Sequence, residues 1–370
     1  MLASRLRPVA GCVLLAIAAP AAAVSFNPLN LVTDDPSAHT AQITDPSLKN
    51  AWGMSFGATS PFWVSATDGG VSTIYAVNPL TQVTTKQALT VTVAGGPTGQ
   101  VFNASSGFNS DRFLFVSEDG SVHGWRPALG TIAETLVTAS PDNSYKGAAI
   151  GSVSGASYLY GANFKAGRID VLKGNPGDPD LASNFTDPSL PAGYAPFNVQ
   201  NLGGTLFVTY AFKSDPGDDE ETKGAGLGLV DAFDLTGAFL GRIATGDTLN
   251  APWGLAIAPS SFGAWAGSLL VGNFGDGRIN AYDAATRSFL GQVAGGDGSP
   301  LAIDGLWAIS PGNDGSAGSS ALLYFTAGPD DEAHGLFGVL SAVPEPSTAA
   351  LLTLGLGGVI GYAARRRRHV

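Results

Sequence analysis

Oxygen-bearing side chains recur along this chain in short turns that also contain glycine. Carboxylate and amide oxygens suit calcium, which takes roughly six to eight oxygen ligands at flexible geometry. A carboxylate beside such an ion could act as a general base, and Asp276 and Asp304 are the candidates for both roles. The alternative is turn chemistry, because Asp or Asn before Gly is also what a tight hairpin needs. The candidate binding residues are Asp68, Glu118, Asp119, Asn163, Asn273, Asp276, Asp304 and Asp330.

The sequence lacks the residue patterns that other kinds of metal or catalytic site require. The chain has four histidines and one cysteine, and they do not have the spacing of a zinc site. No nucleophile elbow, phosphate loop or dinucleotide-binding glycine motif occurs in a suitable context, so catalytic residues stay unknown. The net charge of −11 argues against a nucleic-acid partner.

The N-terminus predicts export. Arg5 and Arg7 precede an apolar stretch, and Ala21 and Ala23 supply the small residues that signal peptidase requires, so we expect a signal peptide over 1–23. Cys12 follows a lipobox-like phrase, but most of the apolar stretch comes after it, which argues against a lipoprotein. If Cys12 leaves with the signal peptide, the mature chain has no cysteine and no disulfide.

The C-terminus combines three features in order. Pro344-Glu345-Pro346 comes first, then an uncharged run over 347–364, then Arg365, Arg366, Arg367 and Arg368. As a helix at about 1.5 Å per residue the run covers roughly 27 Å, just enough for a bilayer core. The arginines predict a cytoplasmic C-terminus, with everything before Pro344 outside.

This tail over 343–370 resembles the PEP-CTERM sorting signal of exopolysaccharide-producing Gram-negative bacteria. The resemblance implies recognition by an exosortase, cleavage near Pro344-Glu345-Pro346, and transfer to the cell surface or extracellular matrix. An ordinary C-terminal anchor, with Pro-Glu-Pro as a stiff spacer, is the alternative.

An internal repeat predicts the fold of residues 24–342. Its clearest copy spans 251–294 and reads as four strands joined by three turns, with an Asn/Asp-Gly hairpin between the second and third. Glycine is abundant, at 50 residues, and charged residues make up only 13%. First-strand phrases of the six copies occur at 51–56, 96–102, 146–150, 195–199, 251–258 and 304–309.

The repeat resembles NHL-type blades, and the whole ectodomain resembles a family of secreted, functionally uncharacterised bacterial propellers. We therefore expect an all-β, six-bladed β-propeller, because a single blade cannot cover its own apolar faces. The last copy lacks a fourth strand, which 29–33 could supply within a strap over 24–50. The resemblance offers no catalytic residues.

In a propeller, the loops joining strand two to three and strand four to the next blade open at the same end of the axis. The candidate residues lie on those loops, so we expect them to face one channel mouth. Blade four adds an acidic loop at 213–226 on that face, interpreted as a solvated loop, with a lid or ion site as the alternative.

Two classes of function follow. The first is a non-catalytic binding platform at the cell surface or matrix, for exopolysaccharide or another envelope protein, processed by signal peptidase and exosortase. The alternative is a calcium-assisted, lactonase-like hydrolase or lyase at the channel mouth, which fold analogy alone motivates.

Overall fold

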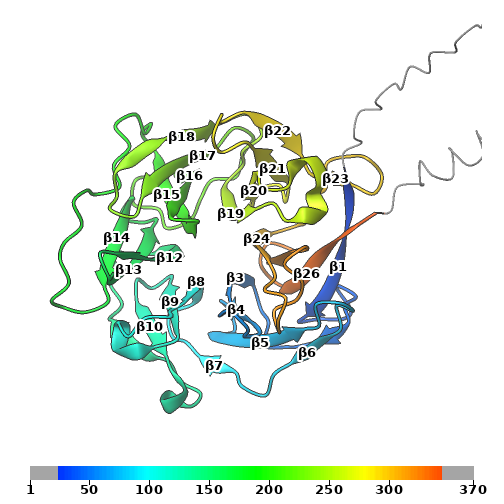
Figure 1. Ribbon diagram of the computed structural model, residues 1–370, viewed down its shortest axis with the longest axis horizontal. Coiled ribbons are helices and arrows are strands. Elements are labelled where there is room, and N and C mark those ends of the chain that lie inside the picture. The colour runs from blue at the N-terminus through cyan, green and yellow to red at the C-terminus, as the bar shows by residue number, and fades with distance from the viewer. Residues whose placement is uncertain (1–23, 344–370) are drawn as a thin grey trace, which may run out of the picture.

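The fold of this protein, described by a computed structural model over residues 24–343, is a ring of six β-sheets around a central axis (Figure 1). The all-β, six-bladed architecture predicted from the repeat is confirmed. The predicted signal peptide at 1–23, the sorting motif from Pro344 and the expected membrane helix lie outside the described residues. Within 24–343, no helix has the length and apolar character needed to cross a bilayer.

Each blade begins with its innermost strand. Blade one contains β3 (Ala51–Ser55), β4 (Phe62–Ala66), β5 (Val71–Val77) and β6 (Thr84–Lys86), and β7 (Val91–Thr92) also pairs with β5. Blade two contains β8 (Pro97–Phe102), β9 (Phe113–Ser117), β10 (Val122–Trp125) and β11 (Glu134–Val137). Blade four contains β15 (Tyr194–Leu202), β16 (Thr205–Phe212), β17 (Leu229–Asp234) and β18 (Phe239–Thr245). Blade five contains β19 (Pro252–Ile257), β20 (Leu269–Asn273), β21 (Ile279–Tyr282) and β22 (Phe289–Gln292).

Blade three has three strands, β12 (Tyr145–Val153), β13 (Ala156–Asn163) and β14 (Arg168–Lys173). A long excursion follows in place of a fourth strand. Phe185 in this excursion is buried and lies between Tyr160, with ring centroids 5.5 Å apart, and Phe233, at 5.6 Å. These contacts fix the excursion to blades three and four.

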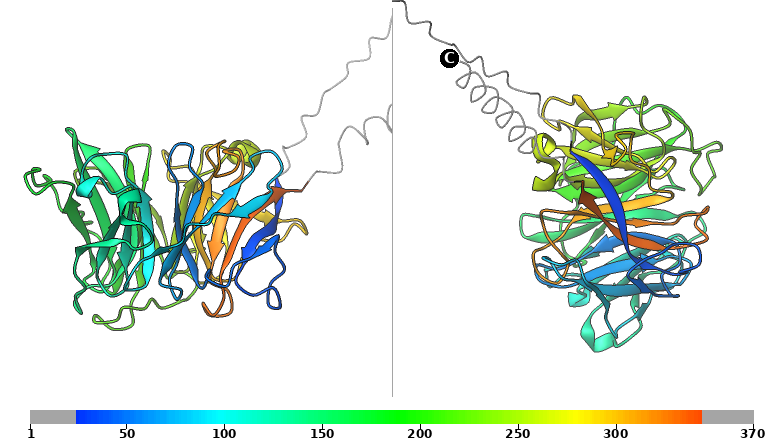
Figure 2. Two further views of the ribbon diagram at one scale, coloured as in Figure 1. Left: turned by 90° about the horizontal axis from the view of Figure 1, so that it is seen from below. Right: turned by 90° about the vertical axis from the view of Figure 1, so that its right-hand side faces the viewer.

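Blade six closes the ring with strands from both ends of the described chain. Its order is β24 (Leu306–Pro311), β25 (Leu323–Ala327), β26 (Leu336–Ala342) and β1 (Ser25–Thr33), and β1 also pairs with β2 (Ile43–Thr44) and β23 (Ala294–Gly295). β1 runs antiparallel to β26, and Phe26, Leu31 and Val32 on it are buried. Both views in Figure 2 show β1 and β26 side by side at the rim.

Glycine lets the inner strands approach one another at the axis. A Cβ added to Gly99 would lie 2.5 Å from the backbone N of Ala148, and one added to Gly254 would lie 2.8 Å from the carbonyl O of Trp307. Side chains also bind across the blades, since Thr98 Oγ1 donates to Tyr145 O at 2.7 Å and Thr326 Oγ1 donates to Trp52 O. The inner strands therefore close on one another and divide the axis into two separate ends.

Candidate functional site

An aromatic plug separates the two ends of the axis. Trp307 lies at its centre, with Trp52 stacked on one face at 3.7 Å between centroids and Phe274 on the other at 3.8 Å. The Trp253 ring meets Trp307 edge-on at 5.9 Å, and its Nε1 donates to Lys146 O at 2.9 Å. The plug lies at the end of the axis where the inner strands begin. This is also the end that carries the loops with the predicted site residues.

Lys146 lies at the centre of that end, on β12. Its side chain is 1% exposed, and Nζ donates to Glu118 Oε1 at 2.6 Å and lies 3.3 Å from Glu220 Oε1. The ammonium also lies 5.3 Å from the centroid of the Trp52 ring. Burial alone would lower the Lys146 pKa, but the charges of Glu118 and Glu220 outweigh burial and raise it.

Further acidic groups lie near Lys146 or near its partner Glu118. We call Asp68, Glu118, Glu220, Glu221 and Glu332, together with Lys146, the acidic mouth. Burial raises the pKa of Glu221 to about 7 although the charge of Lys146 acts in the opposite direction. Burial also raises the pKa of Glu332, whose Oε2 accepts from Asn50 Nδ2 at 2.6 Å. Burial and then the charge of Glu118 raise the pKa of Asp68. Titratable groups perturbed in this way cluster at functional sites more often than elsewhere.

The acidic loop of blade four folds across this mouth. Asp215 and Asp219 are exposed, as expected for a solvated loop, but Glu220 turns toward Lys146. Lys213 is buried and donates to Lys165 O at 2.9 Å and to Pro216 O at 2.8 Å. The loop is thus tied to blade three at both its base and its acidic tip.

Of the predicted site residues, Asp68 and Glu118 meet in the acidic mouth. Asp119 Oδ1 instead accepts from the backbone N of Ser121 at 2.9 Å, within its own turn. Asn163 is buried, and its Oδ1 accepts from the backbone N of Ala166 at 3.1 Å. Asn273 donates to Asp276 Oδ1 at 2.9 Å. Turn chemistry therefore accounts for the contacts of Asp119, whereas Asn163 Nδ2 also donates to Asn143 Oδ1 at 2.8 Å and to Asp170 Oδ2 at 2.7 Å.

Asp276 and Asp304 line one hollow of about 380 Å³ beside the acidic mouth, together with Asp331 and Lys223. Lys223 Nζ lies 4.3 Å from the centroid of the Phe274 ring and 3.7 Å from Asp331 Oδ1. Asp304 Oδ2 accepts from the backbone N of Asp330 at 2.9 Å. Among residues 24–343, no group of three or more His, Cys, Asp or Glu side chains is placed to hold a metal ion.

Asp330 lies apart from the acidic mouth, where its carboxylate is 3.2 Å from His39 Nε2. This pair joins the strap that follows β1 to the hairpin between β25 and β26. A second pair at the same place, Asp34 with His334 at 3.3 Å, does likewise. The two pairs hold the strap against the β25–β26 hairpin and so support the closure of the ring.

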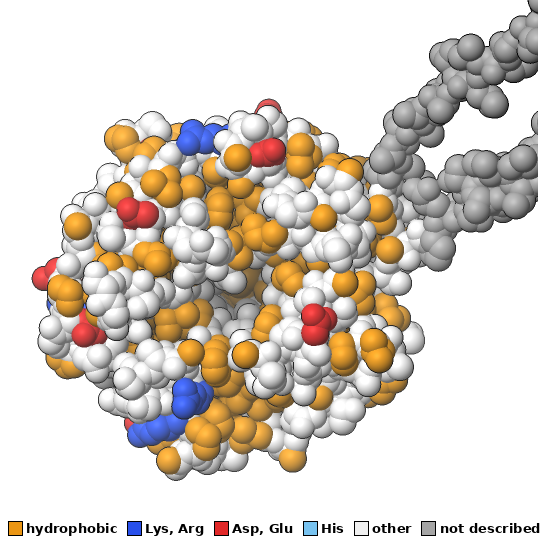
Figure 3. Space-filling model, in the orientation of Figure 1, with side chains coloured by type: hydrophobic (Ala, Val, Ile, Leu, Met, Phe, Trp, Pro, Cys, Tyr) orange, Lys and Arg blue, Asp and Glu red, His pale blue; other side chains and the backbone are white. Residues whose placement is uncertain are grey.

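The other end of the axis carries a site that the sequence analysis did not anticipate. A hollow of about 250 Å³, which we call the amide funnel, opens where the inner strands end. Figure 3 shows it at the centre of the ring, bordered by hydrophobic and uncharged side chains. It is lined by Met54, Ser55, Phe56, Gln100, Val101, Phe102, Ala149, Ile150, Gln200, Asn201 and Ser310, none of which is charged.

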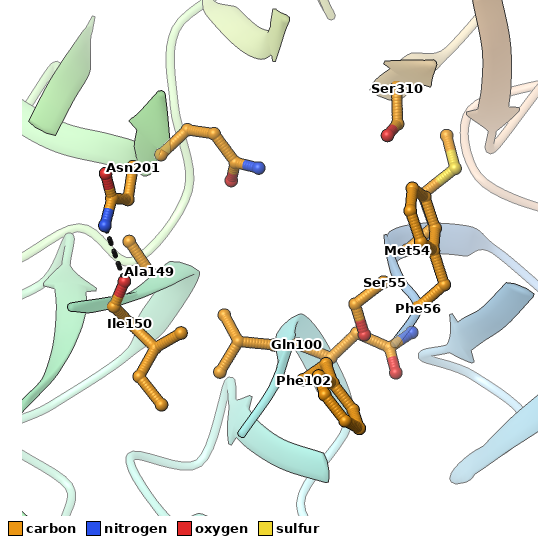
Figure 4. A pocket seen from close by; sticks show the side chains of 11 residues that line it. Met54, Ser55, Phe56, Gln100, Phe102, Ala149, Ile150, Asn201 and Ser310 are labelled. Carbon is orange, nitrogen blue, oxygen red and sulfur yellow. Dashed lines mark hydrogen bonds between the residues drawn. The ribbon is translucent and has the colours of Figure 1, made fainter. Parts of the chain in front are cut away.

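Most amides of the funnel already have partners. Gln100 Nε2 donates to Gly53 O at 2.8 Å and to Trp63 O at 2.9 Å, and Asn201 Nδ2 donates to Ile150 O at 2.9 Å. Figure 4 shows Asn201 and Ile150 across the hollow from Met54 and Ser55. Gln200 differs, because its side chain makes no hydrogen bond to another residue within 24–343. No sequence motif marks the funnel, because five blades (one, two, three, four and six) each contribute one to three uncharged residues.

Comparison with known proteins gives three findings, on the sorting motif, on solved structures and on sequence relatives. The PEP-CTERM protein-sorting motif matches residues 342–368, which confirms the predicted signal and implies a C-terminal membrane segment, export and exosortase processing. Among solved structures, the PQQ-bound aldose sugar dehydrogenase of Streptomyces coelicolor has a TM-score of 0.46 and 17% identity, covering 87% of this chain and 100% of that one. A streptogramin B lyase has a TM-score of 0.42 and 11% identity, covering 87% and 98%.

Two uncharacterised proteins of Acanthamoeba polyphaga mimivirus are similar over most of the chain. One is 32% identical over 314 residues, covering 80% of this chain and 75% of the relative. The other is 31% identical over 323 residues, covering 80% of this chain and 81% of the relative. The chain therefore belongs to the same protein family as these two mimivirus proteins.

Proposed function

We propose that this protein is an exported, exosortase-sorted component of the cell surface or extracellular matrix, and that its propeller binds a ligand without transforming it. The domain division follows from this role: a signal peptide over 1–23, a binding domain over 24–342 and a sorting segment over 343–370. The ligand is an exopolysaccharide or another envelope protein.

The amide funnel carries this proposal. It is a concave site whose lining combines apolar side chains with amide and hydroxyl groups that can orient a ligand. Acid–base or nucleophilic catalysis needs a titratable or activated group near the ligand, and the funnel lining has no charged residue. A ligand held there would be bound and oriented, while Glu118 and Glu332 at the other end remain engaged with Lys146 and Asn50.

The test measures binding of the mature protein to surface material from the producing cells. Ile150→Arg places a long charged side chain at the funnel wall, and we expect it to abolish binding. Leu240→Arg is the matched control, because Leu240 is 50% exposed on the outer strand β18. Equal binding by both variants would refute a site in the funnel.

The second candidate is the calcium-assisted hydrolase or lyase, favoured by the shared hollow of Asp276 and Asp304. Calorimetric titration of the mature protein with calcium tests it. Stoichiometric binding that Asp276→Ala or Asp304→Ala abolishes would support an ion there and justify a search for lactone substrates. Absence of binding would remove this candidate.

A further inference from the structure

The amide funnel ends blindly inside the ring. Below it lies a neck with space of about 20 Å³, room for about one water molecule, lined by Gln200, Asn198 and Trp253 among others. At this level the inner strands touch through glycine, as the contact of Gly99 with Ala148 shows. Beyond the neck, Trp307 and the rings stacked on it close the axis. A polymer therefore cannot thread through the ring.

The lining also restricts the charge of the ligand. An ionised group buried in the funnel would lose its hydration without gaining an opposite charge, and this loss is unfavourable. A peptide terminus, a phosphate or a uronic acid is disfavoured for this reason. A neutral ligand with many hydroxyl groups has no such loss.

Gln200 gives the funnel its directional contact. It lines both the funnel and the neck, at the deepest point that a ligand reaches. Its amide can donate and accept at once, as vicinal hydroxyl groups can. Phe102, Ile150 and Met54 offer apolar surface around it for the C–H faces of a ring.

We propose that the amide funnel captures the terminal residue of a neutral glycan chain, end-on. This inference rests on the proposed binding function. It adds that the ligand is an uncharged glycan and that its terminal residue is the part recognised. The remainder of the glycan extends outward, away from the plug.

A panel of immobilised linear oligosaccharides tests the proposal with the mature protein. The panel contains neutral hexose, deoxyhexose and N-acetylhexosamine chains of several lengths, each with a matched chain that ends in a uronic acid. We expect binding to neutral ends only. For a bound neutral series, calorimetry should give an affinity per chain that does not change with length, because the number of chain ends does not change with length.

Variants connect the binding to the funnel. Gln200→Leu should weaken the affinity roughly 10-fold, as expected when a hydrogen-bonding amide is lost. Gln87→Leu is the matched control, since Gln87 lies outside the funnel and donates to Thr85 O, and it should bind as wild type does. Melting curves of both variants show whether the fold is retained, and Ile150→Arg provides a second block of the funnel.

The outcomes separate this inference from the proposed function. An affinity per chain that rises with the number of sugar units would overturn end capture, because it shows binding along the chain. Equal binding of acid-terminated chains would overturn the preference for a neutral end. Wild-type affinity in Gln200→Leu would overturn the assignment of the binding site to the funnel. Binding to cell-surface material without binding to any glycan would overturn the glycan and leave a protein partner. Binding to neither would overturn both.

Discussion

Ring closure by β1 can be tested by truncating one side chain. Phe26 is 1% exposed and stacks on Phe262 with ring centroids 4.4 Å apart. Phe26→Ala therefore removes a buried ring from β1, the fourth strand of blade six. Such truncations cost about 3 to 5 kcal/mol of the free energy of unfolding. For about 320 folded residues, an unfolding entropy of about 2.1 cal/mol/K per residue gives about 0.7 kcal/mol/K. A loss of about 4 kcal/mol then lowers the melting temperature by about 6 °C.

Differential scanning calorimetry of the mature protein measures this shift. Leu29→Ala is the control on the same strand, because Leu29 is 42% exposed, and it should change the melting temperature by no more than about 1 °C. The reasoning would be refuted if Phe26→Ala melted within 1 °C of wild type, about the limit set for the control, or if both variants shifted equally. Either result would mean that β1 contributes little to the cooperative ring.

Three further predictions concern the axis. Because the Glu221 pKa is raised from 4.5 to about 7 in the folded state, its carboxyl is protonated at pH 5 to 6 only when the chain is folded. The free energy of unfolding of the wild type, relative to that of Glu221→Gln, should therefore fall by about 2 to 3 kcal/mol between pH 5 and 8. Urea unfolding that gives both proteins the same dependence of stability on pH would contradict this. Asp142→Asn, an exposed carboxyl on the same face, should leave the slope unchanged. Lys146→Met removes the cation that faces Glu118 and Glu220, and we expect chemical denaturation at pH 7.5 to show a loss of about 2 to 3 kcal/mol in the free energy of unfolding. This loss is smaller than for a fully buried pair because both glutamates are partly exposed. A stabilised variant would refute the role of these ion pairs. Gly99→Ala should lower the free energy of unfolding by about 1 to 3 kcal/mol, because the added Cβ would meet the Ala148 backbone. Gly177→Ala should be tolerated, because no atom lies within 4 Å of an added Cβ there. Equal melting temperatures of the two variants would show that the inner strands can separate.

The sequence was sufficient to predict the blades because the inner strand and the apolar second strand recur as a local pattern, with an Asx-Gly hairpin in blades one, two and five. The environment of Lys146 was not predictable in the same way. Its partners come from the β9–β10 hairpin and from the blade-four loop, which lie 28 and 74 residues away. A strongly acidic loop normally indicates solvation, and only the position of Lys146 shows why Glu220 turns inward.

The aromatic side chains show the same limit. The repeat alone does not distinguish aromatic side chains that pack between blades from those that reach the axis. Glycine does occupy the axis, but Trp52, Trp253 and Trp307 also project toward it at one end and form the plug. The funnel at the other end consists of common uncharged residues, whose shared position depends on ring geometry and on no local pattern.

The closing strands also bring the two processing points together in space. Val343 N donates to Ser25 O at 2.8 Å, so the residue before the sorting motif lies beside the residues that follow the predicted signal cleavage. β26 is the last strand to leave the translocation channel, and β1, the first to leave, must wait for it. The ring can therefore close only after the whole propeller has been exported, which makes complete translocation a precondition for a folded domain at the sorting site.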